Sequence, residues 1–401
     1  MDLIGFGMII PLSPYLARHF GADELQVGIL MSIYSLMQFF FAPFWGRISD
    51  KKGRKPIIVL SLLGACVSHL GFAFAQSYVQ LFLARMFAGF FGANLSTAMA
   101  YIADVTEEKD RSKGMGLIGA AFGLGFIIGP FFGAELAALG DRLGSLPPFG
   151  QSFAAIGAGA ICFLNAIFAV RWLKESLSDE IRSKAVVENR QTKLPIERIR
   201  LLIAHVGRPT VGPLMQITLI STFSMALMEA TLFLFVQDVL GWSIRQAGYG
   251  FAYVGIVMVF TQGYLIRKVI PKVGEKNTLL AGAILLAIGL AGIGLSRELL
   301  PLAFAVTFLG LGSGLLSPSV SGSISLLTRR DDQGMTIGVN QSFSAMGRII
   351  GPAIGGWLYR DLGMQYPFLV GALTALIAFA IGLSIYAKLP NAGKAGDEVV
   401  A

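Results

Sequence analysis

Asp2, Arg85, Glu229 and Arg348 are ionisable residues that lie inside, or at the edge of, long apolar stretches of this chain. A charge placed inside a membrane span costs roughly 2.5 kcal/mol or more, so each of these residues needs a reason to be there. A carboxylate in an apolar cavity binds a proton readily, and a nearby arginine favours its release. We interpret Glu229 and Asp2 as proton sites, modulated by Arg85 and Arg348. The alternative is that these charges form structural pairs that only fix helix packing.

A second set of charges follows the second apolar stretch, in the segment Gly46-Arg-Ile-Ser-Asp50-Lys-Lys-Gly53-Arg54-Lys55. Glycines such as Gly46 and Gly53 permit a tight turn, and Asp50 can meet Arg54 or the positive N-terminus of a neighbouring helix. Such a pair suits a latch that can break. The matching segment from Gly263 onward, 217 residues later (263 − 46), keeps basic residues but has no acid at that place.

A glycine-proline motif occurs twice, 222 residues apart (347 − 125), which indicates two homologous halves. Its members are Gly125, Gly129, Pro130 and Gly133 in the first copy and Gly347, Gly351, Pro352 and Gly355 in the second. Glycines spaced by four residues form a smooth stripe on one helix face, against which another helix can pack closely. The proline removes one helical hydrogen bond and predicts a bend.

The composition places these elements in a bilayer. Of 401 residues, 54% are hydrophobic and only 14% charged, and the mean hydropathy is +0.68. Twelve stretches are long enough to span roughly 30 Å of hydrocarbon. They are residues 3–17, 27–45, 56–75, 78–102, 115–136, 153–172, 213–236, 249–266, 277–295, 299–327, 336–358 and 367–389. The predicted fold class is an all-α membrane protein with twelve transmembrane helices in two pseudo-symmetric six-helix bundles.

The net charge of +8 does not require a nucleic-acid partner, because the loops follow the positive-inside rule. With the N-terminus inside, 25 Lys and Arg fall on the inner side and five on the outer side. Both termini are therefore predicted to be cytoplasmic. The predicted domains are 1–173 (first bundle), 174–212 (cytoplasmic linker), 213–389 (second bundle) and 390–401 (disordered tail).

Uncharged polar residues within the predicted spans are candidates to line a cavity. They are Gln38, Asn94, Tyr101, Gln216, Gln262, Asn340 and Gln341. Each could instead make a helix-packing hydrogen bond. We predict no metal site, since His69 has no companion ligand at metal-binding spacing, and Cys66 and Cys162 are expected to be structural and unpaired.

Together these motifs resemble the signature set of the major facilitator superfamily, with the twelve-span proton-coupled drug antiporters and the tetracycline-resistance efflux pumps as the nearest likeness. The similarity rests on the Gly46–Lys55 segment, on Arg85-x-x-x-Gly89-x-x-Gly92-Ala93, on Ala103-Asp104 and on the glycine-proline motif. It covers essentially the whole chain and is stronger in the first half.

The resemblance implies two bundles that rock about a central cavity. It assigns a gating latch to the segment after the second span, with Asp104 nearby, proton coupling to Arg85, and antiport to the motif around Pro130. Three features depart from the pattern: Ala134 replaces a glycine, Asp2 lies almost at the N-terminus, and Arg85 has no evident counterpart in the second half.

The predicted function is proton-coupled efflux of lipophilic or amphiphilic small molecules by a monomer in the bacterial inner membrane. The partners are then the transported compound, protons and the lipid bilayer, and the proton gradient takes the place of a cofactor. An exporter or facilitator of a lysolipid, sugar or other metabolite, or a non-transporting sensor, remains open on the same scaffold. An ATP-driven pump or a membrane enzyme is disfavoured, because the chain has no phosphate-binding loop, no His-Glu-x-x-His motif and no nucleophile motif.

Overall fold

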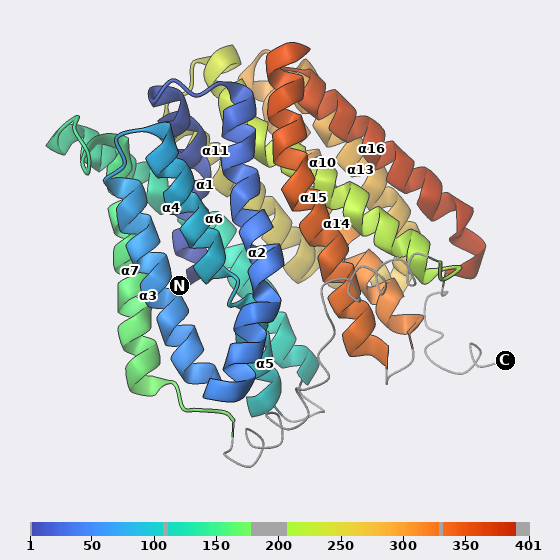
Figure 1. The fold of residues 1–401 in the computed structure, drawn as a ribbon. Helices are drawn as coiled ribbons and strands as arrows, with labels where there is room; N and C mark the ends of the chain where they lie inside the picture. The colour runs from blue at the N-terminus through green and yellow to red at the C-terminus, as the bar shows by residue number, and fades with distance from the viewer. Residues whose placement is uncertain (1, 107–110, 178–206, 329–331, 390–401) are drawn as a thin grey trace. The chain divides into compact units, whose positions relative to one another are not determined.

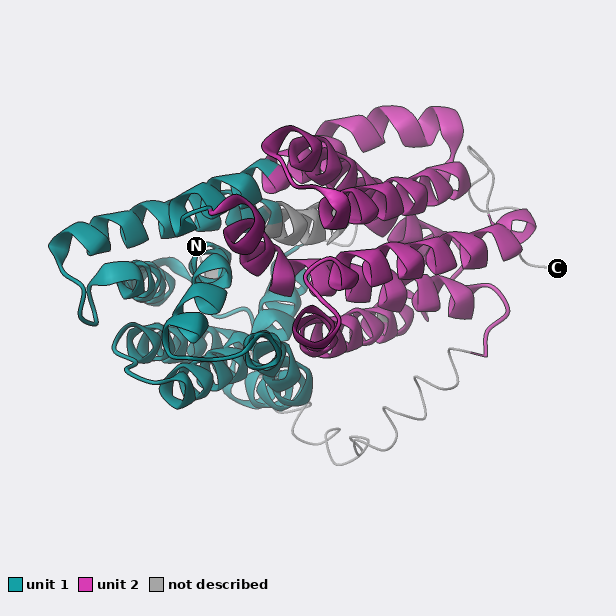
Figure 2. Cartoon of the chain, turned by 90° about the horizontal axis from the view of Figure 1, so that it is seen from above, with its two compact units in different colours: residues 1–192, 242–253 teal, residues 193–241, 254–401 magenta. Residues whose placement is uncertain are grey.

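The structure, a computed structural model, describes residues 2–106, 111–177, 207–328 and 332–389, and all regular secondary structure in these ranges is helical (Figure 1). The side chains of residues 2, 111–120, 122 and 334 lie outside the described part. Contacts divide the chain into unit 1, residues 1–192 with 242–253, and unit 2, residues 193–241 with 254–401 (Figure 2). The segment 242–253 thus clusters with the first unit. Most of the predicted linker, and the predicted tail, fall outside the described residues.

Unit 1 contains the six spans predicted for the first half, one of them broken. Its helices are α1 (Asp2–His19), α2 (Glu24–Lys52), α3 (Arg54–Ala73), α4 (Tyr78–Gly92), α5 (Leu95–Val105), α6 (Arg111–Leu143) and α7 (Phe153–Trp172). The predicted span 78–102 is α4 followed by α5, with a break at Ala93 and Asn94.

Unit 2 supplies the spans of the second half. Its helices are α10 (Val211–Leu240), α11 (Ile244–Phe260), the π-helical turn η4 (Thr261–Leu265), α12 (Ile266–Val273), α13 (Glu275–Leu295), α14 (Leu299–Leu326), α15 (Gln333–Asp361) and α16 (Tyr366–Ser384). The first part of α11, up to Tyr253, belongs to unit 1.

Within the described residues, ten helical stretches are long and apolar enough to cross a membrane. The other two predicted spans, α1 and α15, are also helices but fall outside those ten. Both carry polar residues: α1 ends in Arg18-His19, and α15 includes Asn340, Gln341 and Arg348. The all-α fold with twelve membrane-crossing elements in two groups of six is confirmed.

The glycine stripe of the first half is a close helix contact, as predicted. A Cβ on Gly129 would lie 2.7 Å from the Cα of Gly7 in α1 and 2.8 Å from the carbonyl oxygen of Ile4. A Cβ on Gly133 would lie 2.9 Å from the carbonyl oxygen of Met8. The backbones of α1 and α6 therefore approach more closely than any larger residue at these positions would allow. Helix α6 continues through Pro130.

The second copy of the motif makes the same kind of contact, between α15 and α10. A Cβ on Gly351 would lie 2.6 Å from Ala226 Cβ, and one on Gly355 would lie 3.2 Å from the carbonyl oxygen of Leu227. Ala226 takes the place of Gly7 and Leu227 the place of Met8, a separation of 219 residues in both cases (226 − 7 and 227 − 8). The two units therefore repeat the same packing register.

One glycine conformation recurs in both halves between the second and third spans. Gly53 separates α2 from α3 with φ of 103°, and Gly274 separates α12 from α13 with φ of 82°. Residues with a Cβ rarely adopt this left-handed region. The second half thus keeps the glycine turn, although it has no acidic residue at the place of Asp50.

Replacing Gly129 by Ala tests the close contact. The added methyl group meets backbone atoms of α1, which cannot move aside as a side chain would, so we expect a loss of about 1–3 kcal/mol in unfolding free energy. Gly338→Ala is the matched control, because a Cβ there has no neighbour within 4 Å, and alanine favours a helix by about 1 kcal/mol over glycine. Thermal unfolding in detergent measures both; equal stability of the two variants would contradict the packing argument.

Candidate functional site

Arg85 lies in α4 and is 2% exposed. The Cζ of its guanidinium is 4.6 Å from the ring centroid of Tyr34 and 5.5 Å from that of Phe6. Its Nε and Nη1 have no hydrogen-bond partner among the described residues. Aromatic faces stabilise a buried cation but leave its N–H groups unused. Arg85 therefore has buried N–H groups that can donate to an anionic or polar partner.

The predicted role of Asp2 as a proton site stays a prediction. Asp2 begins α1 one helical turn before Phe6, whose ring faces Arg85. The Asp2 side chain lies outside the described part of the structure.

Unit 2 places Glu229 and Arg348 on two neighbouring helices, α10 and α15. Glu229 lies on α10 between the buried residues Met228 and Ala230, and it is itself partly buried. Arg348 lies on α15, which packs against α10, and it donates a hydrogen bond of 2.9 Å to the Ser344 hydroxyl. Glu229 and Arg348 therefore lie on two helices in close contact, and their roles as proton site and modulator stay a prediction.

The two predicted proton sites do not occupy equivalent places. With the 219-residue relation between α1 and α10, Glu229 corresponds to Ile10 (229 − 219) and Asp2 to Ser221 (221 − 219). The acids are thus about two helical turns apart in height on equivalent helices. Each half has its own arrangement of charge on a shared scaffold.

The predicted latch forms a charge network centred on Arg54. Its Nη1 lies 2.5 Å from Asp50 Oδ1 and 2.7 Å from the Ser49 hydroxyl. Its Nε donates to Asp104 Oδ2 at 3.2 Å. Arg54 thus ties the end of α2 and the end of α5 to the start of α3. Gly46 makes no close contact in this network: a Cβ there would have Ser96 Oγ as its nearest neighbour, at 3.9 Å.

Glu175, just after α7, completes this network and was missed in the sequence. Its carboxylate accepts the backbone N–H groups of Arg54 at 2.8 Å and Lys55 at 3.1 Å. An acid that accepts the unpaired N–H groups of a first helical turn stabilises that helix and its dipole. Next to it, the Ser176 hydroxyl donates to Asp104 at 2.9 Å. No periodicity marks a cap that comes from a residue 120 positions away.

The predicted cavity residues divide into different roles. Gln38 donates to the carbonyl of Gly92 at 2.9 Å, at the break between α4 and α5, so its helix-packing alternative holds. Asn94, at that break, and Asn340 are buried, and the Asn340 Oδ1 has no partner in the described part. The remaining four are partly buried or exposed: Tyr101 and Gln216 are partly buried, and Gln262 and Gln341 are exposed.

Gln262 lies in the π-helical turn η4, which the sequence did not predict. The tight contact of Gly314 with Thr261 accompanies it: a Cβ on Gly314 would lie 2.7 Å from Thr261 Cβ. Single π-turns inside α-helices occur frequently at functional sites. The eighth span, made of α11, η4 and α12, is therefore irregular at this turn, whereas the equivalent helix of the first half, α2, is continuous.

The sequence analysis also missed an ion pair between Arg245 and Glu135 in unit 1. Arg245 donates to both carboxylate oxygens of Glu135 at 2.9 and 2.8 Å, and the Tyr249 hydroxyl donates to the same carboxylate. Glu135 falls inside the predicted span 115–136, so its charge was a signal that could have been used. The pair joins α6 to the first turns of α11, where Gly248 packs against Pro130 and Ala134.

No group of three or more His, Cys, Asp or Glu that could hold a metal exists among the described residues. Cys66 and Cys162 are buried and free of disulfides.

The geometry and the motifs agree with comparisons to known proteins. The family model "Major Facilitator Superfamily" matches residues 1–296 and 268–398. The chain belongs to the major facilitator superfamily.

Its relatives in this superfamily include drug-resistance proteins. The chain is 32% identical to the class B tetracycline resistance protein of Escherichia coli, over 90% of this chain and 86% of the relative. It is 30% identical to multidrug resistance protein 2 of Bacillus subtilis, over 94% and 90%. A bacterial homologue of the human lysosomal transporter Spinster, solved in an inward-facing, occupied conformation, has a similar fold, with a TM-score of 0.78, 14% identity and coverage of 96% and 94%.

Membership of this superfamily makes the chain an integral membrane protein of a transporter family. The superfamily signature predicted for the segment after the second span therefore coincides with an observed network, in which Arg54, Asp50 and Asp104 are in contact.

Glu175→Ala tests the cap of α3. Two backbone N–H groups lose their acceptor, so we expect a loss of about 1 kcal/mol, a typical value for removal of a cap. Glu298→Ala is the control, because Glu298 occupies the N-cap position of α14 without a side-chain cap hydrogen bond. Thermal unfolding of both variants gives the comparison, and a Glu175 variant as stable as the Glu298 variant would rule out the cap.

Proposed function

We propose that this chain is a secondary transporter that exports lipophilic or amphiphilic small molecules in exchange for protons, by alternating access. The observation that carries the proposal concerns two charged side chains, Arg85, which is buried, and Glu229, which is partly buried. Arg85 and Glu229 lie in apolar helices, and within the described residues neither forms an ion pair of 4.0 Å or less. A buried charge of purely structural value would be expected to be paired and hydrogen-bonded. Charges kept ready for another partner are typical of transport pathways.

The names of the relatives support the cargo class. Resistance proteins for tetracycline and for multiple drugs are similar to this chain over most of its length. The chain carries thirty phenylalanines and fourteen methionines, side chains that repack around varied apolar compounds.

The proposed coupling uses the two halves differently. Glu229 takes up and releases the proton, with Arg348 as the neighbouring charge that favours release. Arg85, with Asp2, serves the first half. The Arg54 network is the latch that opens and closes during the cycle, and the α1–α6 and α10–α15 contacts keep each half nearly rigid.

The proposed setting is the bacterial cytoplasmic membrane, with both termini inside and the protein acting as a monomer. The distribution of 25 basic residues against five supports this orientation. Protons, the exported compound and the surrounding lipid are then the partners. No nucleic acid is involved, and the proton gradient supplies the driving force without a further cofactor.

Transport in liposomes tests the proposal directly. The purified protein is reconstituted with an imposed pH gradient, and lipophilic compounds, tetracycline among them, are added while lumenal pH is recorded with a trapped dye. Proton movement that depends on both compound and protein is the expected result. A folded protein that moves protons with none of a broad panel would contradict the proposal and favour a sensor or an exporter of narrow specificity.

Glu229→Gln removes the proposed proton site while keeping side-chain size. We expect proton-driven transport to fall at least about a hundredfold, the range for loss of an essential proton-transfer group, while facilitated exchange of labelled compound without a gradient persists. Asp361→Asn is the control, since Asp361 is exposed at the end of α15 and bonds to the adjacent Arg360. Full coupled transport by the Glu229 variant would remove this residue from the mechanism.

A further inference from the structure

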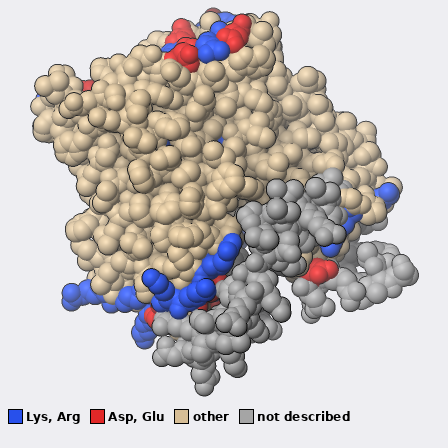
Figure 3. All heavy atoms as spheres, in the orientation of Figure 1, with Lys and Arg blue, Asp and Glu red and all other residues tan. Residues whose placement is uncertain are grey.

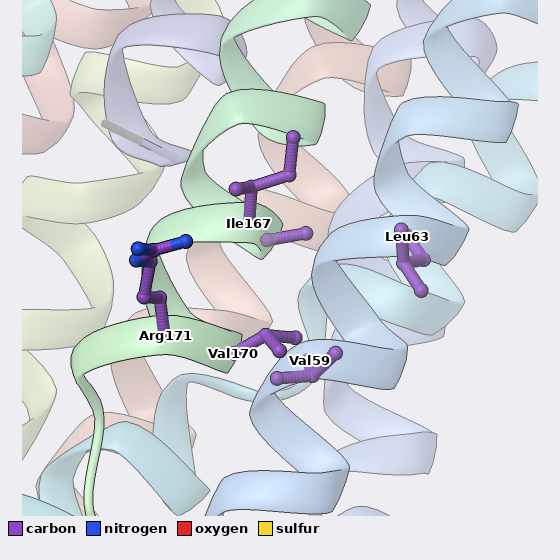
Figure 4. Close-up of a pocket in the computed structure, with 6 residues that line it drawn as sticks. Val59, Leu63, Ile167, Val170 and Arg171 are labelled. Atoms are coloured by element: carbon purple, nitrogen blue, oxygen red, sulfur yellow. The ribbon is translucent and has the colours of Figure 1, made fainter.

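One hollow on the surface of unit 1 has no role in the transport proposal. It is a groove of about 320 Å³ between α3 and α7. Its lining residues are Val59, Leu63, Ala166, Ile167, Val170 and Arg171. Figure 4 shows Val59 and Val170 meeting at one end, with Leu63 and Ile167 on the two walls.

The groove exists because α7 presents a small residue where α3 presents larger ones. Ala166 is 2% exposed and packs with Leu62 and Ala169 to form the floor. Leu63 and Ile167 remain 40% and 47% exposed at the walls. In an integral membrane protein, exposed side chains of this kind face lipid tails. The hollow is therefore apolar, open at the side, and of a volume at the lower end of ligand sites, which run from roughly 300 to 1,000 Å³.

One end of the groove is basic. Arg171 belongs to the last turn of α7, and its guanidinium Cζ lies 5.9 Å from the ring centroid of Trp172. Lys55 donates from Nζ to the carbonyl of Val170 at 2.8 Å, and Lys174 follows on the exposed loop. Tryptophan with Arg or Lys at a helix end is typical of the membrane–water interface. Figure 3 shows Lys and Arg gathered at this end of unit 1.

The acids near this end are already engaged. Glu175 accepts the N–H groups at the start of α3, and Asp50 and Asp104 both bind Arg54. Glu175 keeps its negative charge, because the N–H groups it accepts are neutral, but Lys55, Arg171 and Lys174 outnumber it, so the mouth of the groove carries a net positive charge. An apolar channel that ends in a basic mouth at interface depth has the chemistry of one kind of ligand, a fatty acyl chain attached to an anionic headgroup.

We propose that the α3–α7 groove binds an anionic phospholipid, with one acyl chain along Leu63 and Ile167 and the phosphate beside Arg171. The lipid fills the hollow above Ala166 and bridges the two helices. Selectivity for a negative headgroup comes from Arg171, and the acyl chain contributes contact that any phospholipid would make. The site is distinct from the buried charges proposed for transport, and it stands whether or not that proposal holds.

Native mass spectrometry with defined lipids tests this site. The protein in mild detergent is offered equal amounts of phosphatidylglycerol and phosphatidylcholine whose acyl chains differ in mass. We expect mainly phosphatidylglycerol adducts. Arg171→Gln should lower the ratio of the two adducts about fivefold, the value for one basic residue near an anionic lipid surface. Arg142→Gln, an exposed arginine in the last turn of α6, is the charge-matched control and should leave the ratio unchanged.

A second variant tests the groove itself. Ala166→Leu fills the floor and should remove adducts of both lipids, whereas Val67→Leu, at a 68% exposed position one turn beyond Leu63, should keep them. Phosphatidylglycerol should also raise the unfolding temperature of the unmodified protein and not that of Arg171→Gln. Should Ala166→Leu fail to fold, Arg171→Gln still decides the question.

Three results would overturn the proposal. Equal binding of the two lipids by the unmodified protein would mean that no headgroup is selected. An unchanged adduct ratio in Arg171→Gln would exclude the assigned residue. Displacement of phosphatidylglycerol by an exported compound, one for one, would make the groove a cargo site instead.

Discussion

The close approach of one helix pair in each unit is the constraint on which the rest of this structure depends. In lipid, helices gain little from burying apolar surface against each other, so their association relies on packing at short range. Gly129 against Gly7 in unit 1, and Gly351 against Ala226 in unit 2, make that short range possible. With α1 fixed on α6, Phe6 lies over the Arg85 guanidinium, and with α10 fixed on α15, Glu229 and Arg348 lie on adjoining helices.

The repeated contact also separates what the halves share from what they do not. The packing register is the same to the residue, and the left-handed glycines Gly53 and Gly274 show that a turn has been kept as well. The ionisable groups do not follow this repeat, because Glu229 corresponds to Ile10. Backbone geometry that allows two helices to touch must be kept in both halves, whereas a buried charge is costly and is kept only where it is used. The asymmetry of the charges is thus itself an argument that they are functional.

The spans, the duplication and the Asp50–Arg54 pair could be predicted from the sequence, because each depends on residues close together in the chain. Apolar length predicts a span, and the four-residue spacing of Gly125, Gly129 and Gly133 predicts the contact face. Asp50 and Arg54 are only four residues apart in the sequence, so their pairing could be predicted directly. The break after Gly92 and the π-turn at Thr261 were not predicted, because each changes only a few hydrogen bonds and leaves the hydrophobic pattern intact. Both lie against other helices, as Gly314 lies against Thr261 and Gly92 against Tyr34.

Glu175 shows most clearly why part of the site needs a structure. In the sequence it is one charge among many in a polar stretch, and such runs are usually solvated. In the fold, its carboxylate holds the backbone N–H of Arg54, while the side chain of the same arginine holds Asp50 and Asp104. Arg54 is therefore held from two sides: Glu175 binds its backbone, and Asp50 and Asp104 bind its side chain. Any displacement of the end of α7 must therefore either carry Arg54 with it or break the cap of α3, so the chain after α7 is joined to the Arg54 charge network.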